Sequence, residues 1–168
     1  MAKVTLKGNM IHTSGELPLV KSHAPDFKLV DKELKDRSLK DFKGKRKLLS
    51  IVPSLDTAVC SLSTKKFNEA VKNHPEVFVL VISTDLPFAQ TRVCGAEGID
   101  HIRTLSMMRS KDFARDYGIL IIDGPLAGIC ARSVVVLDDQ DRVVYTELVP
   151  EITQEPNYDK ALQALLKK

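Results

Sequence analysis

Short hydrophobic runs alternate with amphipathic segments along this chain. Two continuous runs, Leu48–Val52 and Val77–Ser83, are strand-sized and predict strands buried on both faces of a sheet. Between them, the spacing of Phe67, Ala70 and Val71, with lysine and glutamate residues on the opposite side, predicts an amphipathic helix. A buried strand, a helix and a second buried strand are typical of an α/β unit.

The C-terminal half predicts a second set of elements. Lys111–Tyr117 has the pattern of a short helix, and Ser133–Asp138 and Arg142–Leu148 are two predicted strands joined by an acidic turn. A last amphipathic helix begins at Asn157 or Asp159, because both residue types cap helices. Since a hairpin adds antiparallel strands to the first unit, the expected sheet is mixed.

The N-terminal region predicts a small hairpin. Val4 and Leu6 alternate with polar residues, and Met10 resumes the alternation after a Lys-Gly-Asn turn. The segment 86–96 is compatible with either a helical turn or a loop, because Gly95 weakens a helix. The chain therefore predicts an α/β fold, with a mixed central β-sheet flanked by α-helices and an N-terminal β-hairpin. This is the pattern of a thioredoxin-like domain, although other α/β folds fit the pattern alone about equally well.

Length and composition exclude several classes of protein. The 168 residues are 43% hydrophobic and 28% charged, which predicts one globular domain over residues 1–168. The net charge of +3 comes from 25 basic and 22 acidic residues without a basic run, so we expect no nucleic-acid partner. We also expect no membrane contact and a cytoplasmic location, because no hydrophobic run is bilayer-sized and the N-terminus lacks a signal-peptide pattern.

Three cysteines, Cys60, Cys94 and Cys130, carry the candidate chemistry. Cys60 lies in the first turn of the helix that follows the first buried strand. Unpaired backbone N–H groups and the positive end of the helix dipole favour an anion there, and the thiolate is the reactive form of cysteine. The alternative is a small core residue on the inner face of the helix, because Phe67 stands seven residues further on.

Other kinds of cysteine site fit the sequence less well. The four histidines lack metal-ligand spacing with any cysteine, so we expect no metal. Cys60 and Cys94 are 34 residues apart, which excludes the C-x-x-C motif of thioredoxin-type oxidoreductases. For Cys130 the expectation is a buried, inert thiol.

The neighbours of Cys60 favour chemistry over packing. Thr57 stands one helical turn before Cys60 and is, with Asp56, a candidate cap of the helix, while Pro53 at the strand end can shield one side of the sulfur. The pattern Pro53-x-x-x-Thr57-x-x-Cys60 resembles the active-site motif of the peroxiredoxins, and Ala24-Pro-Asp-Phe resembles their upstream strand.

Three further segments resemble one group of that family more narrowly. They are Ser83–Gly98 (STDLPFAQTRVCGAEG), Gly124–Val134 (GPLAGICARSV) and Pro156–Tyr158. All three are similar to segments of the bacterial thiol peroxidases, an atypical two-cysteine group, and the resemblance covers essentially the whole chain.

The resemblance implies a role for each candidate residue. Cys60 would be the peroxidatic cysteine, which becomes a sulfenic acid, and Cys94 the resolving cysteine, which forms a disulfide with Cys60. Thr57 would hydrogen-bond the thiolate and the peroxide, Arg132 would hold the thiolate and polarise the peroxide, and Pro53 would shield the site. The implied activity is reduction of hydrogen peroxide and organic hydroperoxides, with thioredoxin as the reductant, a homodimeric assembly and no cofactor.

Two other functions stay open from the residues alone. A redox sensor would use the same cysteines without turnover. A thioredoxin-like binding domain would use its cysteines structurally, and the joint presence of Pro53, Thr57, Cys60 and Arg132 disfavours it. Within the peroxiredoxins, resolution by a cysteine of another subunit is a further alternative.

Overall fold

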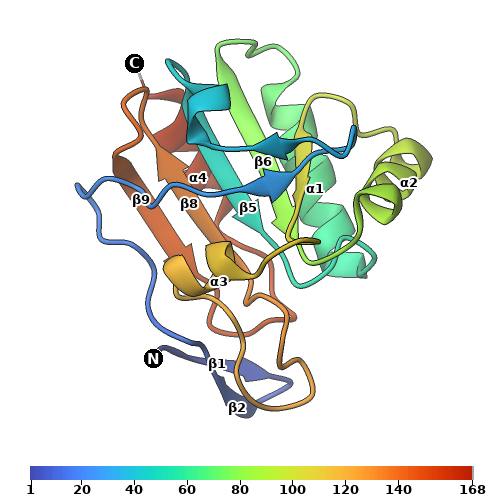
Figure 1. Cartoon of the computed structure of the whole chain (residues 1–168), viewed down its shortest axis with the longest axis vertical. Helices are drawn as coiled ribbons and strands as arrows, with labels where there is room; N and C mark the ends of the chain where they lie inside the picture. Colours follow the sequence, from blue (N-terminus) through green and yellow to red (C-terminus); the bar gives the residue numbers. More distant parts are fainter. Residues whose placement is uncertain (168) are drawn as a thin grey trace.

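A seven-stranded mixed sheet forms the centre of the molecule (Figure 1). This computed structural model describes residues 1–167, so the last residue of the predicted domain 1–168 lies outside the described residues. The strands of the sheet are β3 (Leu29–Val30), β4 (Asp36–Arg37), β5 (Arg46–Ile51), β6 (Val77–Ser83), β7 (Arg103–Ser106), β8 (Ser133–Leu137) and β9 (Val143–Leu148). Their order across the sheet is β4-β3-β7-β6-β5-β8-β9.

The two continuous hydrophobic runs form the middle of this sheet. β5 and β6 pair in parallel, with Leu49 opposite Leu80, and β8 pairs antiparallel with β5 on its other side. Leu49 and Leu80 are completely buried, as strands covered on both faces require. The predicted buried strands and the C-terminal hairpin of β8 and β9 are therefore confirmed.

Helices cover both faces of the sheet. They are η1 (Leu39–Phe42, a 3-10 turn), α1 (Ala58–Val71), α2 (Pro87–Glu97), α3 (Asp112–Asp116) and α4 (Tyr158–Leu166). Figure 1 shows α1 and α4 on one face, α3 on the other, and α2 beyond the β7 side of the sheet. Within residues 1–167, no helix is long and apolar enough to cross a membrane.

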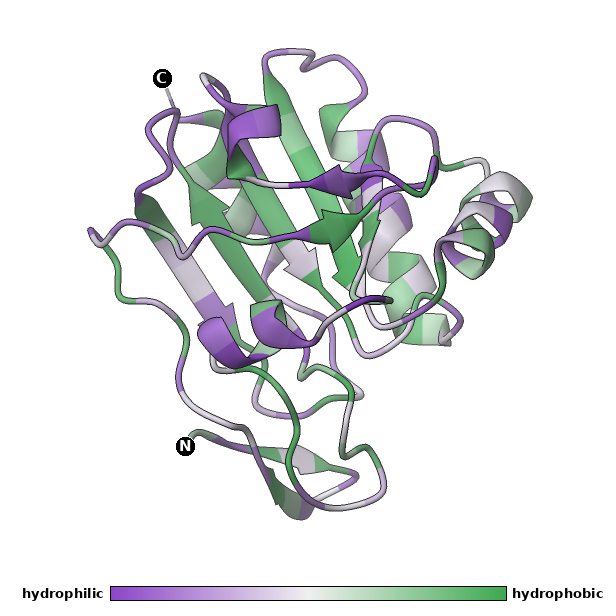
Figure 2. Ribbon diagram, viewed as in Figure 1, coloured by the Kyte–Doolittle hydropathy of each residue, from purple (hydrophilic) through white to green (hydrophobic). Residues whose placement is uncertain are grey.

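The core lies in two layers, one on each side of the sheet. Figure 2 shows that the central strands of the sheet are made mainly of hydrophobic residues. On the α1 side, Phe67 is completely buried and its ring stands 5.2 Å from that of Tyr158 at the start of α4. On the other side, Phe27, Phe113 and Tyr117 pack ring against ring. These two layers pack against both faces of β5 and β8, and the ends of these strands carry the candidate site.

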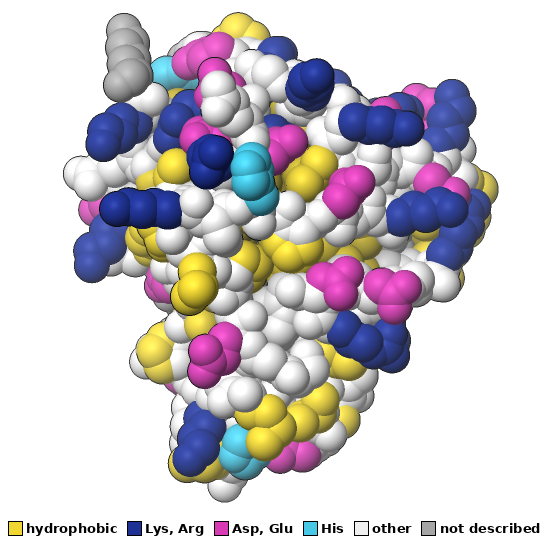
Figure 3. All heavy atoms as spheres, turned by 60° about the vertical axis from the view of Figure 1, so that its left-hand side comes forward, with side chains coloured by type: hydrophobic (Ala, Val, Ile, Leu, Met, Phe, Trp, Pro, Cys, Tyr) yellow, Lys and Arg dark blue, Asp and Glu magenta, His cyan; other side chains and the backbone are white. Residues whose placement is uncertain are grey.

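The N-terminal hairpin stands apart from the sheet. β1 (Lys3–Leu6) and β2 (Asn9–His12) pair antiparallel, as predicted. The turn between them has two left-handed residues, Lys7 at φ +50° and Gly8 at φ +81°, which suits the twist of a two-residue hairpin. The hairpin packs on Ile121, Ala131 and Ile152 at the lower end of Figure 1. On the face shown in Figure 3, acidic and basic side chains are interspersed, and hydrophobic side chains gather toward this end.

Two features of the fold differ from the pattern of the sequence. The segment that was compatible with a helical turn or a loop is the eleven-residue helix α2, which begins with Pro87 and ends at Gly98 in a left-handed conformation, φ +66°. The short strands β4 and β7 have no predicted counterpart. β7 has four residues, and its neighbours β6 and β3 determine its conformation through sheet hydrogen bonds.

Candidate active site

Cys60 lies where the chain turns from β5 into α1. The exposed fraction of its side chain is zero, and it is the third residue of the helix. Thr57 is the N-cap, as predicted, and its Oγ1 accepts a hydrogen bond from the Cys60 N–H at 3.3 Å. The sulfur is therefore held in the first helical turn, where backbone N–H groups favour a negative charge.

Arg132 brings a positive charge to this sulfur. Its Nη1 stands 3.2 Å from Cys60 Sγ, and its Nε donates to the Ile152 carbonyl oxygen at 3.0 Å. Arg132 is only 3% exposed. Because β8 runs antiparallel to β5, with Ser133 opposite Ile51, the residue before β8 lies beside the end of β5. A buried guanidinium therefore directs a hydrogen-bond donor at the sulfur.

An acidic residue near this cation escaped the sequence analysis. Glu155 accepts hydrogen bonds from the Tyr158 hydroxyl at 2.8 Å and from Lys66 Nζ at 3.1 Å. These hydrogen bonds hold the pKa of the Glu155 carboxyl below its usual range, and the charge of Arg132 adds to the effect. Glu155 thus supplies a negative charge close to Arg132. The signal available in the sequence was its position directly before the Pro156–Tyr158 segment.

The structure places Pro53 and Thr57 next to the site in different ways. Pro53 is buried in the loop between β5 and α1. The Thr57 side chain is exposed, and its hydroxyl donates to the Ser54 carbonyl oxygen at 3.2 Å. Because a hydroxyl has one proton, Thr57 must release Ser54 before it can donate to a thiolate or a peroxide.

Cys94 lies on α2, away from the buried sulfur of Cys60. Both cysteines are free thiols. Cys94 is half-buried, and burial raises the pKa of its thiol. It borders a cavity of about 550 Å³ together with Phe42 and Arg103, whereas Thr57 borders a different cavity of about 740 Å³ between α1 and α2. The structure therefore brings Cys60 and Arg132 together and keeps Cys94 on a neighbouring helix.

The third cysteine is enclosed in the core. Cys130 has no exposed surface, and its Sγ lies 3.8 Å from the sulfur of Met107. Burial raises the pKa of its thiol to about 12. This environment agrees with the buried, inert thiol that the sequence predicts.

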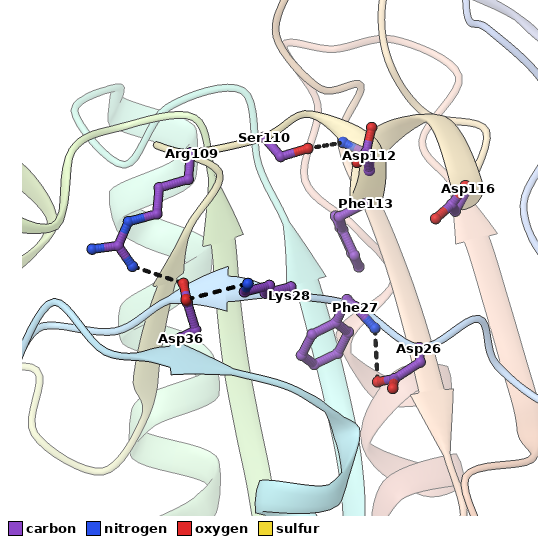
Figure 4. A pocket seen from close by; sticks show the side chains of 9 residues that line it. All are labelled: Asp26, Phe27, Lys28, Asp36, Arg109, Ser110, Asp112, Phe113 and Asp116. Carbon is purple, nitrogen blue, oxygen red and sulfur yellow. Dashed lines mark hydrogen bonds and ion pairs between the residues drawn. The ribbon is translucent and has the colours of Figure 1, made fainter.

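Another cavity, between α3 and the strands β3 and β4, holds paired charges instead of a thiol. Its volume is about 490 Å³. Arg109 contacts Asp36 at 2.7 Å and Lys28 contacts the same carboxylate at 3.6 Å (Figure 4). These three charges pair with one another, and no cysteine is among the described residues that line this cavity. The part of the chain that the structure describes contains no cluster of three or more metal-ligating side chains.

Comparisons with known proteins agree with this geometry. A model of the redoxin family matches residues 19–162. The chain is 52% identical over 166 residues to a curated thiol peroxidase of Leptospira interrogans (serogroup Icterohaemorrhagiae), across 98% of this chain and 97% of the relative.

Solved structures give the same result. A peroxiredoxin-like protein from Aquifex aeolicus superposes with a TM-score of 0.91 and 41% identity, covering 98% of this chain and 96% of that one. A thiol peroxidase from Chromobacterium violaceum superposes with a TM-score of 0.89 and 26% identity, covering 97% and 94%. The mixed sheet flanked by helices, with its N-terminal hairpin, is shared with these neighbours, and the predicted fold class is confirmed.

Proposed function

The chain belongs to the redoxin family, and we propose that it is a thiol peroxidase, an enzyme that reduces hydrogen peroxide and organic hydroperoxides through cysteine chemistry. One observation carries the proposal at this site: the buried sulfur of Cys60 stands in the first turn of α1 with Arg132 Nη1 at 3.2 Å. A structural cysteine in the core needs no buried cation beside it.

The first step is attack of the Cys60 thiolate on the terminal oxygen of the peroxide. An S–O bond forms and the O–O bond breaks, so the sulfur is oxidised to a sulfenic acid. The leaving oxygen departs as an alcohol or water after it takes a proton. The guanidinium of Arg132 presents several donors, so it can hold the thiolate and polarise the peroxide together. Pro53 shields the sulfur, and Thr57 donates to the peroxide once its hydroxyl turns from Ser54.

The second step is attack of Cys94 on the sulfenic acid of Cys60. An S–S bond forms, the S–O bond breaks and water leaves. In this proposal the first turn of α1 and the helix α2 loosen, so that the two Cα atoms can come within the about 7 Å that a disulfide requires. Opening also removes Cys94 from the half-buried position that raises the pKa of its thiol.

The third step restores both thiols. A dithiol protein, thioredoxin in this proposal, attacks the disulfide to give a mixed disulfide, and its second thiol then releases the reduced enzyme. Sulfur carries all the electrons, so this cycle uses no metal, haem or flavin. We further propose that residues 1–168 form one domain, and that the protein acts as a cytoplasmic homodimer in antioxidant defence, without nucleic-acid or membrane partners.

The surroundings of Thr57 support organic hydroperoxides as substrates. Thr57 borders the cavity between α1 and α2 with Leu55, Leu86 and Phe88. Leu86 is 51% exposed and Phe88 is 65% exposed, so apolar surface lies open to solvent beside the site. Contact with this surface favours an alkyl or aryl group over the hydrogen of hydrogen peroxide.

The experiment that tests the function measures peroxide consumption with thioredoxin, thioredoxin reductase and NADPH. Wild type, Cys60→Ser, Cys94→Ser and, as the matched control, Cys130→Ala are compared with cumene hydroperoxide and hydrogen peroxide. We expect turnover in the wild type and the control, none in Cys60→Ser, and no sustained turnover in Cys94→Ser. Normal turnover in Cys60→Ser would refute the nucleophile. Rapid oxidation of wild-type Cys60 without turnover would favour a redox sensor.

A further inference from the structure

Asp85 connects the segment before Cys60 to the segment before Cys94. It lies between β6 and α2 and is half-buried. One carboxylate oxygen accepts from the Ser54 hydroxyl at 2.8 Å, and the other accepts from the Leu55 N–H at 2.8 Å. Ser54 and Leu55 belong to the loop between β5 and α1. The carboxylate that accepts hydrogen bonds from this loop therefore belongs to the segment that leads into α2.

The connection continues into α2 itself. The Ser83 hydroxyl donates to Asp85 at 2.7 Å and accepts from Gln90 Nε2 at 3.0 Å. The same Gln90 amide donates to the Leu105 carbonyl oxygen at 3.0 Å. Gln90 has no exposed surface and stands one helical turn before Cys94. A continuous set of hydrogen bonds thus runs from the Cys60 loop through Asp85 to the turn of α2 next to Cys94.

We propose that Asp85 is a positioning residue that latches the two cysteine-bearing segments in the closed arrangement, so that its release couples their opening. This inference rests on the proposed peroxidase cycle, which needs both arrangements. In this cycle peroxide attack uses the closed arrangement, in which Arg132 contacts Cys60. Disulfide formation uses the open one, in which both segments have moved. A carboxylate that serves both segments loses its donors when either one moves.

One observation favours a latch over a permanent anchor, and a second compares its strength with that of another contact. Gln90 Oε1 is buried and has no hydrogen-bond partner among the residues that the structure describes. Leaving a buried carbonyl unsatisfied disfavours the closed state, and opening relieves this by admitting water. An ion pair of Lys65 with Glu97 also joins the two helices, and it is on the surface. Surface ion pairs contribute little to stability, so the Asp85 hydrogen bonds are the stronger restraint.

The test separates the two chemical steps. One equivalent of cumene hydroperoxide is added to reduced protein, and acid quenching with mass spectrometry follows the Cys60–Cys94 disulfide over time. A second series in excess peroxide measures the fraction of Cys60 that reaches the sulfinic acid. The variants are Asp85→Ala, Asp85→Asn and Ser54→Ala, with Glu97→Gln as the matched control on the surface tie.

We expect Asp85→Ala to form the disulfide at least roughly tenfold faster, because the hydrogen bonds of Ser54 and Leu55 to the charged carboxylate are lost. It should also yield less sulfinic acid and react more slowly with peroxide. Asp85→Asn should restore most of the wild-type behaviour, because its amide oxygen still accepts from the Leu55 N–H and its amide nitrogen can donate to the Ser54 hydroxyl. Ser54→Ala should shift the same quantities in the same direction by a smaller factor, and Glu97→Gln should not.

The outcomes that overturn the latch differ from those that overturn the function. An unchanged division between disulfide and sulfinic acid in Asp85→Ala, or equal slowing of both steps, would show that Asp85 is only structural. If Asp85→Ala does not fold, the same division measured in Ser54→Ala decides. A wild type that forms no Cys60–Cys94 disulfide would instead refute the proposed function.

Discussion

Replacing Arg132 by methionine removes the cation beside Cys60 while keeping an apolar chain in the buried space. The distance of 3.2 Å between Arg132 Nη1 and Cys60 Sγ sets an upper limit on the interaction free energy of this contact. Two unit charges at that distance interact by about 5 kcal/mol at an effective dielectric constant near 20, which is an upper limit. Measured hydrogen bonds to charged groups contribute about 1.5–3 kcal/mol, and this range sets the lower limit on the interaction free energy.

These limits predict the loss in rate. Since about 1.4 kcal/mol corresponds to a factor of ten, we expect Arg132→Met to lower the second-order rate constant with peroxide roughly 100-fold. The rate constant of Arg132→Lys should lie between those of the wild type and Arg132→Met. Its ammonium keeps the charge, but it cannot donate to the sulfur and to the Ile152 carbonyl oxygen in the fixed geometry of the guanidinium.

The rate is best measured by competition with a haem peroxidase, because the chain has no tryptophan to report on the reaction. Thermal unfolding serves as the control for the fold. Removing one partner of a buried charged pair destabilises a protein, so Arg132→Met should unfold at a lower temperature than the wild type while remaining folded at the temperature of the assay. A folded Arg132→Met that reacts within threefold of the wild-type rate would contradict the role of this contact.

Four further outcomes follow from the structure. Burial raises the pKa of the Cys94 thiol above its ordinary value of 9.0. The protonated thiol therefore stabilises the closed state fully at pH values below 9.0, and this stabilisation is lost as the pH rises through the raised pKa. Alkylation of Cys94 should therefore need higher pH than alkylation of the unfolded chain; coincident pH profiles would contradict this. Cys130→Ala should keep full turnover and lower the free energy of unfolding by roughly 1 kcal/mol in urea titration, since it removes one buried atom. Phe67→Ala should lower it by about 3–5 kcal/mol in the same titration. The pKa of Glu151 is lowered to about 2, chiefly by the hydrogen bond from the Thr5 hydroxyl. Some backbone amides of the hairpin donate hydrogen bonds to Glu151. Their hydrogen exchange should be slowed at pH values above 4.5, the ordinary pKa of glutamate, and this protection should be lost as the pH falls toward about 2.

The sheet was predictable because its strands carry a strong local signal. β5 and β6 are continuous hydrophobic runs, and the caps Thr57 and Asn157 stand directly before α1 and α4. β7 has no such signal, because only Leu105 and Ser106 of its residues are buried. Its place depends on pairing with β6, which lies 20 or more residues earlier in the chain and cannot be seen in a local pattern.

The site divides in the same way. The position of Cys60 in the first turn of a capped helix follows from local residues. The contact with Arg132 joins residues that are 72 positions apart and depends on the antiparallel register of β5 and β8. Only the resemblance to a known family pointed to that arginine. The Ile152 carbonyl oxygen was beyond sequence reasoning, because a backbone acceptor has no residue type to recognise.

The helix that was hardest to predict is also the one that the proposed peroxidase cycle requires to move. α2 contains Gly95, buries only Pro87 and Gln90, and has no acidic residue in its first turn and no basic residue in its last. Its intrinsic helix stability is therefore low, and tertiary contacts such as the Gln90 hydrogen bonds hold it in place. A strongly amphipathic helix in this position would be easy to predict. It would also resist the opening that lets Cys94 reach Cys60. In this cycle, weak local preference and the capacity to form the disulfide have the same physical cause.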